Sequence, residues 1–113
     1  MKIYIAGKIT GEPLEACKMK FEKISDALRQ INAIPINPFK LGCKDHWTFE
    51  QCKPFCFKSI RQCDAIFMLD DYHDSPGALQ ELAEAKELNI PVFYQSANEC
   101  YEIIEFFKLK YAS

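Results

Sequence analysis

Residues 64–69 read Asp-Ala-Ile-Phe-Met-Leu, and residues 75–81 read Ser-Pro-Gly-Ala-Leu-Gln-Glu. An apolar run that ends in acidic and polar residues is typical of a buried strand whose C-terminal end reaches a site. Ser75 then has the character of a helix N-cap, with Pro76 at the first helical position. Ligands of an open α/β sheet bind where strands end and helices begin. This stretch therefore predicts a strand, a turn and a helix beside a ligand pocket.

Glu81 lies one turn inside this predicted helix, near its positive end. At about 100° per residue, it falls on the border between a solvated stripe and a buried stripe of the helix. Its neighbours along the same ridge are Gly77 and Ala85, and such small residues beside a half-buried carboxylate leave room for a ligand. Two interpretations remain open: a first-turn acid that the helix dipole favours, or a functional carboxylate.

The whole chain alternates predicted strands with predicted helices. The strands are residues 2–6, 33–37, 64–69 and 90–94, and the helices are residues 14–31, 48–62, 76–89 and 99–110. This alternation implies βαβ units with right-handed crossovers and a parallel sheet. The predicted fold class is α/β, a flavodoxin-like or Rossmann-like three-layer sandwich with four strands, or five, in the order 2-1-3-4. Residues 1–113 are expected to form a single domain.

Composition narrows the classes of partner. The chain has 113 residues, of which 49% are hydrophobic, and its formal net charge is -2. This charge gives no electrostatic footprint for nucleic acid or for an anionic membrane. No apolar run approaches the length of a membrane span, and the N-terminus has no long apolar segment typical of a secretion signal. We therefore expect a cytoplasmic protein whose partners include neither nucleic acid nor membrane.

Six cysteines are many for this length, but without a secretion signal they do not predict a disulfide framework. Cys43, His46, Cys52 and Cys56 lie within 14 residues and include the soft ligands that zinc prefers, so a zinc-stabilised interaction domain is one hypothesis. Their spacing fits no standard zinc finger, and a domain of this size has an apolar core without a metal. The favoured prediction is no metal and no cofactor, with these residues serving packing and loop roles.

The first and third predicted strands end beside each other at the switch in strand order, so the loops that follow them form the expected site. The first loop supplies Gly7, Lys8, Thr10 and Gly11. Glycines let backbone N–H groups approach an oxyanion, and a lysine pairs with a phosphate. The spacing matches neither a dinucleotide fingerprint nor a Walker loop, so a simple tight turn is the alternative interpretation.

The second loop carries Asp70, Asp71, His73 and Asp74, which either form a solvated loop or place one acid opposite Glu81. Two carboxylates on either side of a glycosidic bond are the usual equipment of a retaining double displacement. One of them attacks the anomeric carbon, and the other protonates the leaving group. Tyr4, near the end of the first strand, is either the residue that orients the nucleophile or a buried strand aromatic.

Three motifs together resemble the nucleoside 2-deoxyribosyltransferase superfamily, including its deoxynucleoside-monophosphate N-glycosidases and its small phage and bacterial members of unknown function. These motifs are Tyr4-Ile-Ala-Gly7-Lys-Ile9-Thr-Gly11, Asn37-Pro38 and Ser75-x-Gly77-x3-Glu81. The resemblance covers nearly the whole chain and implies the flavodoxin-like sandwich. It also implies a nucleoside or nucleotide ligand, no metal, and a homo-oligomer, either a dimer or a larger assembly.

The resemblance further implies roles for individual residues. Glu81 matches the catalytic nucleophile, which forms a covalent deoxyribosyl-enzyme, and Tyr4 matches a tyrosine beside it. The remaining matches are candidate substrate-binding residues. They are Gly7, Lys8, Thr10 and Gly11, in the loop that meets the 5′ end of the substrate, and Ser75, the serine that binds its phosphate. Asp71 and Gly77 are two further candidate substrate-binding residues of this chain.

The chain departs from the family pattern in the helix before the third strand. The family carries an aspartate there that positions the substrate and protonates the base, and this position falls near Cys56. Asp71 and Asp74 are the candidate substitutes. The leading hypothesis is cleavage of an N-glycosidic bond, or deoxyribosyl transfer, through a glycosyl-Glu81 intermediate. The alternative is a non-catalytic nucleotide-binding module that retains the pocket.

Two groups of apolar residues each have two possible roles. Phe39, Trp47 and Phe49 either stack on a base or form a hydrophobic lid. The last predicted helix has an apolar stripe that either covers the sheet or contacts a second subunit. Its members are Tyr101, Ile104, Phe107 and Tyr111.

Overall fold

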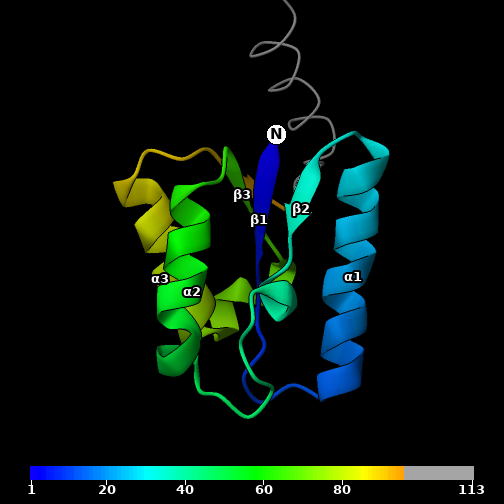
Figure 1. The fold of residues 1–113 in the computed structure, drawn as a ribbon, viewed down its shortest axis with the longest axis vertical. Coiled ribbons are helices and arrows are strands. Elements are labelled where there is room, and N and C mark those ends of the chain that lie inside the picture. Colours follow the sequence, from blue (N-terminus) through cyan, green and yellow to red (C-terminus); the bar gives the residue numbers. More distant parts are fainter. Residues whose placement is uncertain (96–113) are drawn as a thin grey trace, which may run out of the picture.

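The structure is a computed structural model, and it describes residues 1–95. Its centre is a parallel sheet of four strands in the order β2-β1-β3-β4 (Figure 1). The strands are β1 (Lys2–Ala6), β2 (Ile34–Ile36), β3 (Ala65–Met68) and β4 (Val92–Tyr94). The predicted α/β class, parallel pairing and order 2-1-3-4 are confirmed. Since β1 and β3 are neighbours, the loops that follow them leave the sheet side by side.

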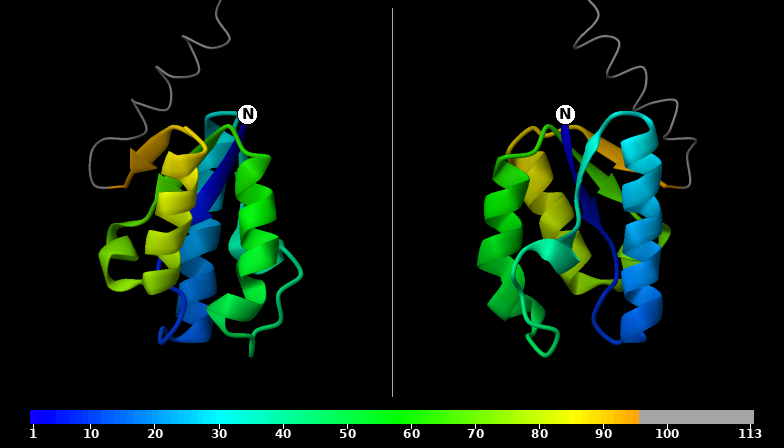
Figure 2. Two further views of the ribbon diagram at one scale, coloured as in Figure 1. Left: turned by 90° about the vertical axis from the view of Figure 1, so that its left-hand side faces the viewer. Right: turned by 45° about the vertical axis from the view of Figure 1, so that its right-hand side comes forward.

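Within residues 1–95, three α-helices cover the sheet in two layers. α1 (Leu14–Gln30) lies on one face, while α2 (Phe49–Arg61) and α3 (Pro76–Glu87) lie together on the other (Figures 1 and 2). Side chains alternate along a strand, so β1 supplies two hydrophobic clusters: Ile3 and Ile5 pack on the α1 side, and Tyr4 packs on the side of α2 and α3. The predicted three-layer sandwich is therefore confirmed.

The helices on the site side of the sheet begin at the predicted caps. Thr48 forms a capping box with Gln51 at the start of α2, because each side chain bonds the other residue's backbone N–H. Ser75 caps α3, where its Oγ accepts a hydrogen bond of 3.1 Å from the N–H of Ala78. These caps fix where both helices start, and hence where their first turns meet the strand ends.

Two segments predicted as loops contain short 3₁₀ helices. η1 (Pro38–Lys40) follows β2, and η2 (Asp70–Asp74) follows β3. η1 forms because the Asn37 side chain accepts a hydrogen bond from Phe39 N–H at 3.0 Å and Pro38 presets the backbone. The loop prediction was wrong for both segments, since turns this short leave no periodic signal in the sequence.

Element boundaries differ from the predicted ones by at most two residues. β2 is shorter than residues 33–37 because Asn32 has a left-handed backbone (φ 64°) and Asn37 turns into the cap of η1. α3 ends before residue 89, where Asn89 is again left-handed (φ 57°). The predicted helix 99–110 and its apolar stripe lie outside the described residues.

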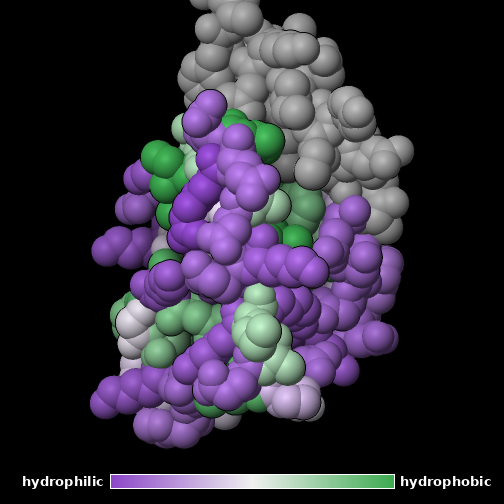
Figure 3. Space-filling view, turned by 90° about the vertical axis from the view of Figure 1, so that its right-hand side faces the viewer, coloured by the Kyte–Doolittle hydropathy of each residue, from purple (hydrophilic) through white to green (hydrophobic). Residues whose placement is uncertain are grey.

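The surface over α1 is mostly hydrophilic (Figure 3). The exposed lysines and acids of α1 account for this, with Met19 as an exposed apolar side chain among them. Within residues 1–95, none of the helices combines the length and the apolar character that crossing a membrane requires.

Candidate active site

A pocket of about 100 Å³ opens at the edge of the sheet where β1, β2 and β3 end. Its wall is built by the β1–α1 loop, η1 and the segment after it, the first turns of α2, and the start of α3. The lining side chains used below are Gly7, Ile9, Thr10, Phe39, Cys43, Trp47, Phe49, Cys52, Cys56, Ser75, Gly77 and Glu81. The site thus lies where ligands of open α/β sheets bind.

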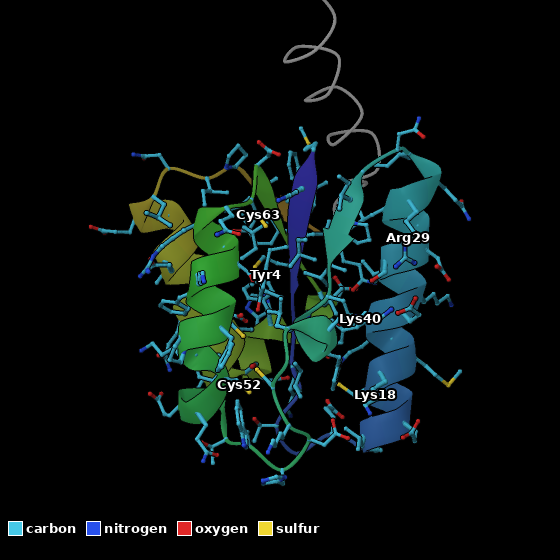
Figure 4. The ribbon with its side chains drawn as sticks, in the orientation of Figure 1. Tyr4, Lys18, Arg29, Lys40, Cys52 and Cys63 are labelled. Atoms are coloured by element: carbon cyan, nitrogen blue, oxygen red, sulfur yellow. The ribbon has the colours of Figure 1, made fainter. Side chains whose placement is uncertain are left out.

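Glu81 lies in the wall of this pocket and is otherwise enclosed by protein. Only 5% of its surface is exposed, so the prediction of a half-buried carboxylate was wrong. The reason lies in neighbouring elements: Tyr4 of β1 and Cys56 of α2 both pack against it. The Tyr4 hydroxyl donates a hydrogen bond to Glu81 Oε2, and Tyr4 itself is fully buried between β1 and α2 (Figure 4).

Burial decides the protonation of this cluster. It raises the pKa of Glu81 to about 8, because a charged carboxylate loses its hydration there, while the hydrogen bonds from Tyr4 and Cys56 act in the opposite direction. Burial likewise raises the pKa of the Cys56 thiol to about 12, and the pKa of Tyr4 lies well above its usual 10.0. Tyr4 and Cys56 are therefore neutral at pH 7, and Glu81 is the group that titrates near physiological pH.

This pKa predicts an unusual dependence of stability on pH. Folded Glu81 keeps its proton up to about pH 8, whereas the unfolded chain loses it near 4.5. The folded state is therefore favoured by this group below pH 4.5, and that stability is lost as the pH rises towards 8. Each pH unit in this interval costs about 1.4 kcal/mol of unfolding free energy.

The Glu81→Gln variant has no such group and is expected to lose this dependence. The difference in unfolding free energy between variant and parent is then expected to grow in favour of the variant from pH 5 to pH 8, by about 3 kcal/mol. Urea unfolding of both proteins across this range measures it. A constant difference contradicts the raised pKa of the folded state.

The remaining wall of the pocket is aromatic. Phe39, Trp47 and Phe49 all line it, which places the three rings that the sequence left undecided in the candidate site. Phe39 packs edge-on against Phe21 at 5.4 Å between ring centroids, and Trp47 contacts Phe55 at 5.7 Å. Rings held in this way form a rigid apolar surface of the kind that stacks on a planar ligand.

Gly77 is the point where α3 meets this aromatic wall. A Cβ atom at Gly77 would lie 2.8 Å from Cδ1 of Phe49, too close for the ring to stay in place. In Gly77→Ala, Phe49 is therefore expected to move into the pocket, with a loss of about 1–3 kcal/mol in unfolding free energy. Thermal unfolding and nucleoside binding measure the two effects, with Lys86→Ala as a control at an exposed position of α3 outside the pocket lining. Unchanged binding by Gly77→Ala contradicts the placement of Phe49.

Of the four binding residues predicted in the first loop, two line the pocket and two do not. Gly7 and Thr10 line the pocket, whereas Lys8 and Gly11 do not. Ser75 also lines it, although its hydroxyl oxygen already accepts the capping bond of α3.

Asp71 does not line the pocket, and neither do the other acids of the second loop. The hypothesis that one of them faces Glu81 was therefore wrong. The reason is that η2 turns Asp71 towards the β1–α1 loop, where it bonds the backbone N–H of Lys8 and the ammonium of Lys20. The contact of Lys20 with Asp71 was not predicted from the sequence, since a single lysine on a helix gives no sign of such a contact.

Of the four residues predicted as alternative metal ligands, the three cysteines line the pocket and the histidine does not. Cys43, Cys52 and Cys56 line the pocket, and Figure 4 marks Cys52 on α2, while His46 is exposed and does not line it. Among residues 1–95, no group of three or more His, Cys, Asp or Glu side chains is arranged to hold a metal ion. Burial raises the pKa of Cys52 to about 12, so this thiol is neutral at pH 7.

A protein-family model covers most of this chain. A family model described as "Domain of unknown function (DUF4406)" matches residues 1–94. Among curated proteins, none matches the sequence.

The solved structures that are similar to this chain include the following two. One is a 2-deoxyribosyltransferase from the psychrotolerant bacterium Bacillus psychrosaccharolyticus, with a TM-score of 0.59 and 28% sequence identity over 83% of this chain and 71% of that chain. The other is the solution structure of BlsM, with a TM-score of 0.64 and 17% identity over 98% of this chain and 74% of that chain, a likeness that shows the fold alone. The resemblance found in the sequence is thus confirmed in three dimensions.

Proposed function

The chain belongs to the family described as domain of unknown function DUF4406, and we propose that it breaks the N-glycosidic bond of a nucleoside or nucleoside 5′-monophosphate, with Glu81 as the attacking group. The observation that carries this proposal is the carboxylate itself. Glu81 is buried, is hydrogen-bonded by Tyr4, and lies in the wall of an apolar pocket with three aromatic rings. The similar 2-deoxyribosyltransferase supports nucleoside-related chemistry.

The pocket offers what such a substrate needs. The rings of Phe39, Trp47 and Phe49 supply a surface on which a base stacks, and Glu81 of α3 lines the same pocket. A base held against the rings places its sugar within reach of the carboxylate. Gly7 and Thr10 then flank the sugar from the β1–α1 loop.

The proposed reaction is a double displacement. An ionised oxygen of Glu81 attacks the anomeric carbon, the bond from that carbon to the base nitrogen breaks, and the electron pair leaves with the base, which takes a proton from water. Water, or the nitrogen of a second base, then attacks the same carbon and releases Glu81. Exclusion of water from the closed site decides between hydrolysis and transfer.

Tyr4 acts on the charge of the nucleophile. Glu81 with a pKa of about 8 is mostly protonated at pH 7, so it must lose a proton before it attacks. The hydrogen bond from Tyr4 favours the ionised form and lowers the energy needed for this step. The rate of base release is therefore expected to rise with pH through the pKa of Glu81.

A second candidate function is a nucleotide-binding module without catalysis. It is favoured by the side chain next to Glu81: Cys56, a neutral thiol, stands near the position where the resemblance leads us to expect an aspartate that protonates the base. With no acid at that position, departure of a poor leaving group is slow, and the pocket is left to bind its ligand.

The experiment that separates the two functions is a panel of 2′-deoxynucleosides and their 5′-monophosphates. Free base is measured by chromatography, and ligand-induced thermal stabilisation is measured on the same samples. Release of base by the parent protein, and none by Glu81→Gln, supports the enzyme. Stabilisation without any released base overturns the proposed chemistry and supports the binding module.

A further inference from the structure

We propose that Lys20 and Asp71 form a clamp that positions the β1–α1 loop, residues 7–13, against the candidate active site. This clamp, the ion pair of the two side chains together with their bonds to the backbone of Lys8, lies outside the pocket lining. Its effect on substrate binding rests on the proposed function, whereas its effect on the loop does not.

The contacts converge on a single residue of the loop. Asp71 Oδ1 accepts a hydrogen bond of 2.9 Å from the backbone N–H of Lys8, and Lys20 Nζ donates one of 2.9 Å to the backbone carbonyl of Lys8. Lys20 Nζ and Asp71 Oδ2 then close the clamp at 2.5 Å. The thiol of Cys17 adds a donor to the same carbonyl at 3.3 Å. The backbone N–H and carbonyl of Lys8 are thus both held by side chains from other elements.

These contacts join three elements that are far apart in the sequence. Lys20 belongs to α1, Asp71 belongs to η2, and Lys8 follows β1. The two loops also meet directly next to the clamp, because a Cβ atom at Gly7 would lie 2.7 Å from the side chain of Leu69. The N–H of Leu69 bonds the carbonyl of Ala6 at 2.8 Å. The start of the loop therefore lies fixed against the start of η2.

The clamp affects the site because Lys8 lies between residues that line the pocket. Gly7 precedes Lys8, and Ile9 and Thr10 follow it; all three line the pocket, whereas Lys8 does not. Residues that line a pocket bind a ligand better when they are held in place before it arrives, since ordering them on binding costs free energy. Lys20 and Asp71 are therefore positioning residues, which act on the ligand through Gly7, Ile9 and Thr10.

The charges of Lys20 and Asp71 make this pair suited to holding the loop in place. The two side chains are about a third exposed, 31% for Lys20 and 28% for Asp71, so their attraction is less screened than that of a fully exposed pair. Each also bonds the backbone with a charged group, and charge-assisted bonds are stronger than neutral ones. Losing either charge breaks the ion pair of the clamp and weakens the bonds by which these two side chains hold the backbone of Lys8.

The test compares Lys20→Met, Asp71→Asn and the control Lys23→Met, which removes a neighbouring exposed lysine of α1 that takes no part in the clamp. Amide hydrogen exchange of residues 8–10 is measured on the free proteins. The dissociation constant of a 2′-deoxynucleoside, and KM and kcat for base release, are measured well below the unfolding temperature. Lys20→Met keeps the aliphatic stem, and Asp71→Asn keeps the shape, so at least one of them is expected to fold.

We expect faster exchange at Lys8 in both clamp variants and not in the control. The dissociation constant and KM are expected to rise by about tenfold, with a smaller change in kcat, because the loop must then be ordered when the ligand binds. A role in stability alone lowers the unfolding temperature and leaves KM unchanged. Equal exchange in the parent and the clamp variants, or faster exchange with unchanged affinity, overturns the proposal.

Hydrogen exchange keeps this test apart from that of the proposed function. If the parent protein releases no base, the proposed glycosidic reaction is overturned. The clamp proposal is then tested by hydrogen exchange at Lys8 and by the affinity for the nucleoside. If the parent protein releases base and hydrogen exchange is unaltered in Lys20→Met, the clamp proposal is overturned and the proposed function stands.

Discussion

Replacing Glu81 with glutamine is expected to abolish base release while leaving the fold and the ligand pocket in place. The amide has nearly the shape of the carboxyl group that it replaces, and it still accepts the hydrogen bond from Tyr4. It cannot attack an anomeric carbon to form a stable glycosyl ester, so we expect the rate to fall by about 10³-fold or more. Initial rates of base release, with nucleoside affinity measured on the same preparation, check this.

The control for this variant is an acid on the same helix. Glu84→Gln removes a carboxylate that pairs with Arg61 on the surface and does not line the pocket. It is expected to release base at the parent rate. Comparable losses in both variants would mean that the charge of α3, and not the position of Glu81, is what matters.

Replacing Tyr4 with phenylalanine is expected to shift the pH dependence of base release to higher pH. The hydrogen bond from Tyr4 lowers the pKa of Glu81, so its removal raises that pKa above about 8. Since the ionised carboxylate is the reactive form, the rate at pH 7 falls, by about 10- to 100-fold, and recovers partly at higher pH. Profiles of kcat/KM between pH 5 and pH 10 measure the shift.

A second tyrosine provides the matched control. Tyr94 of β4 stacks on Tyr72 and lies outside the pocket lining, so Tyr94→Phe is expected to keep the parent profile. An unshifted profile in Tyr4→Phe contradicts the role given to its hydroxyl, whatever the absolute rate.

The fold was predictable because its signals are local or follow general rules. The apolar runs at residues 2–6 and 64–69 identify central strands that are buried on both faces, and the right-handed crossover rule then orders the sheet. The helix caps at Thr48 and Ser75 could be predicted for the same reason, since capping depends on residues within three positions of each other. η1 and η2 left no such signal.

The site was predictable only in part. The position of Glu81 at the edge of the sheet followed from the motif, but its burial did not, because a border position on a helix is decided by what packs against it. Here Tyr4 and Cys56 come from two other elements. The partners of Asp71 were missed for a similar reason: they depend on the direction in which η2 leaves β3.

Cys56 lies next to Glu81 in the pocket. A count back from Asp64 placed the expected family aspartate near this residue, and in the structure its thiol does lie against Glu81. The position where the resemblance leads us to expect an acid is thus held by a neutral thiol that lines the pocket. This is the feature that keeps a binding module as the second candidate.

The central claim is that Glu81 becomes covalently attached to the sugar. It is tested most directly by quenching the protein with acid during turnover of a 2′-deoxynucleoside and locating the attached sugar by peptide mass spectrometry. The account predicts one deoxyribosyl group on the peptide that contains Glu81, and none in Glu81→Gln. Base that accumulates with no sugar on the protein, or with the sugar on a different residue, would contradict it.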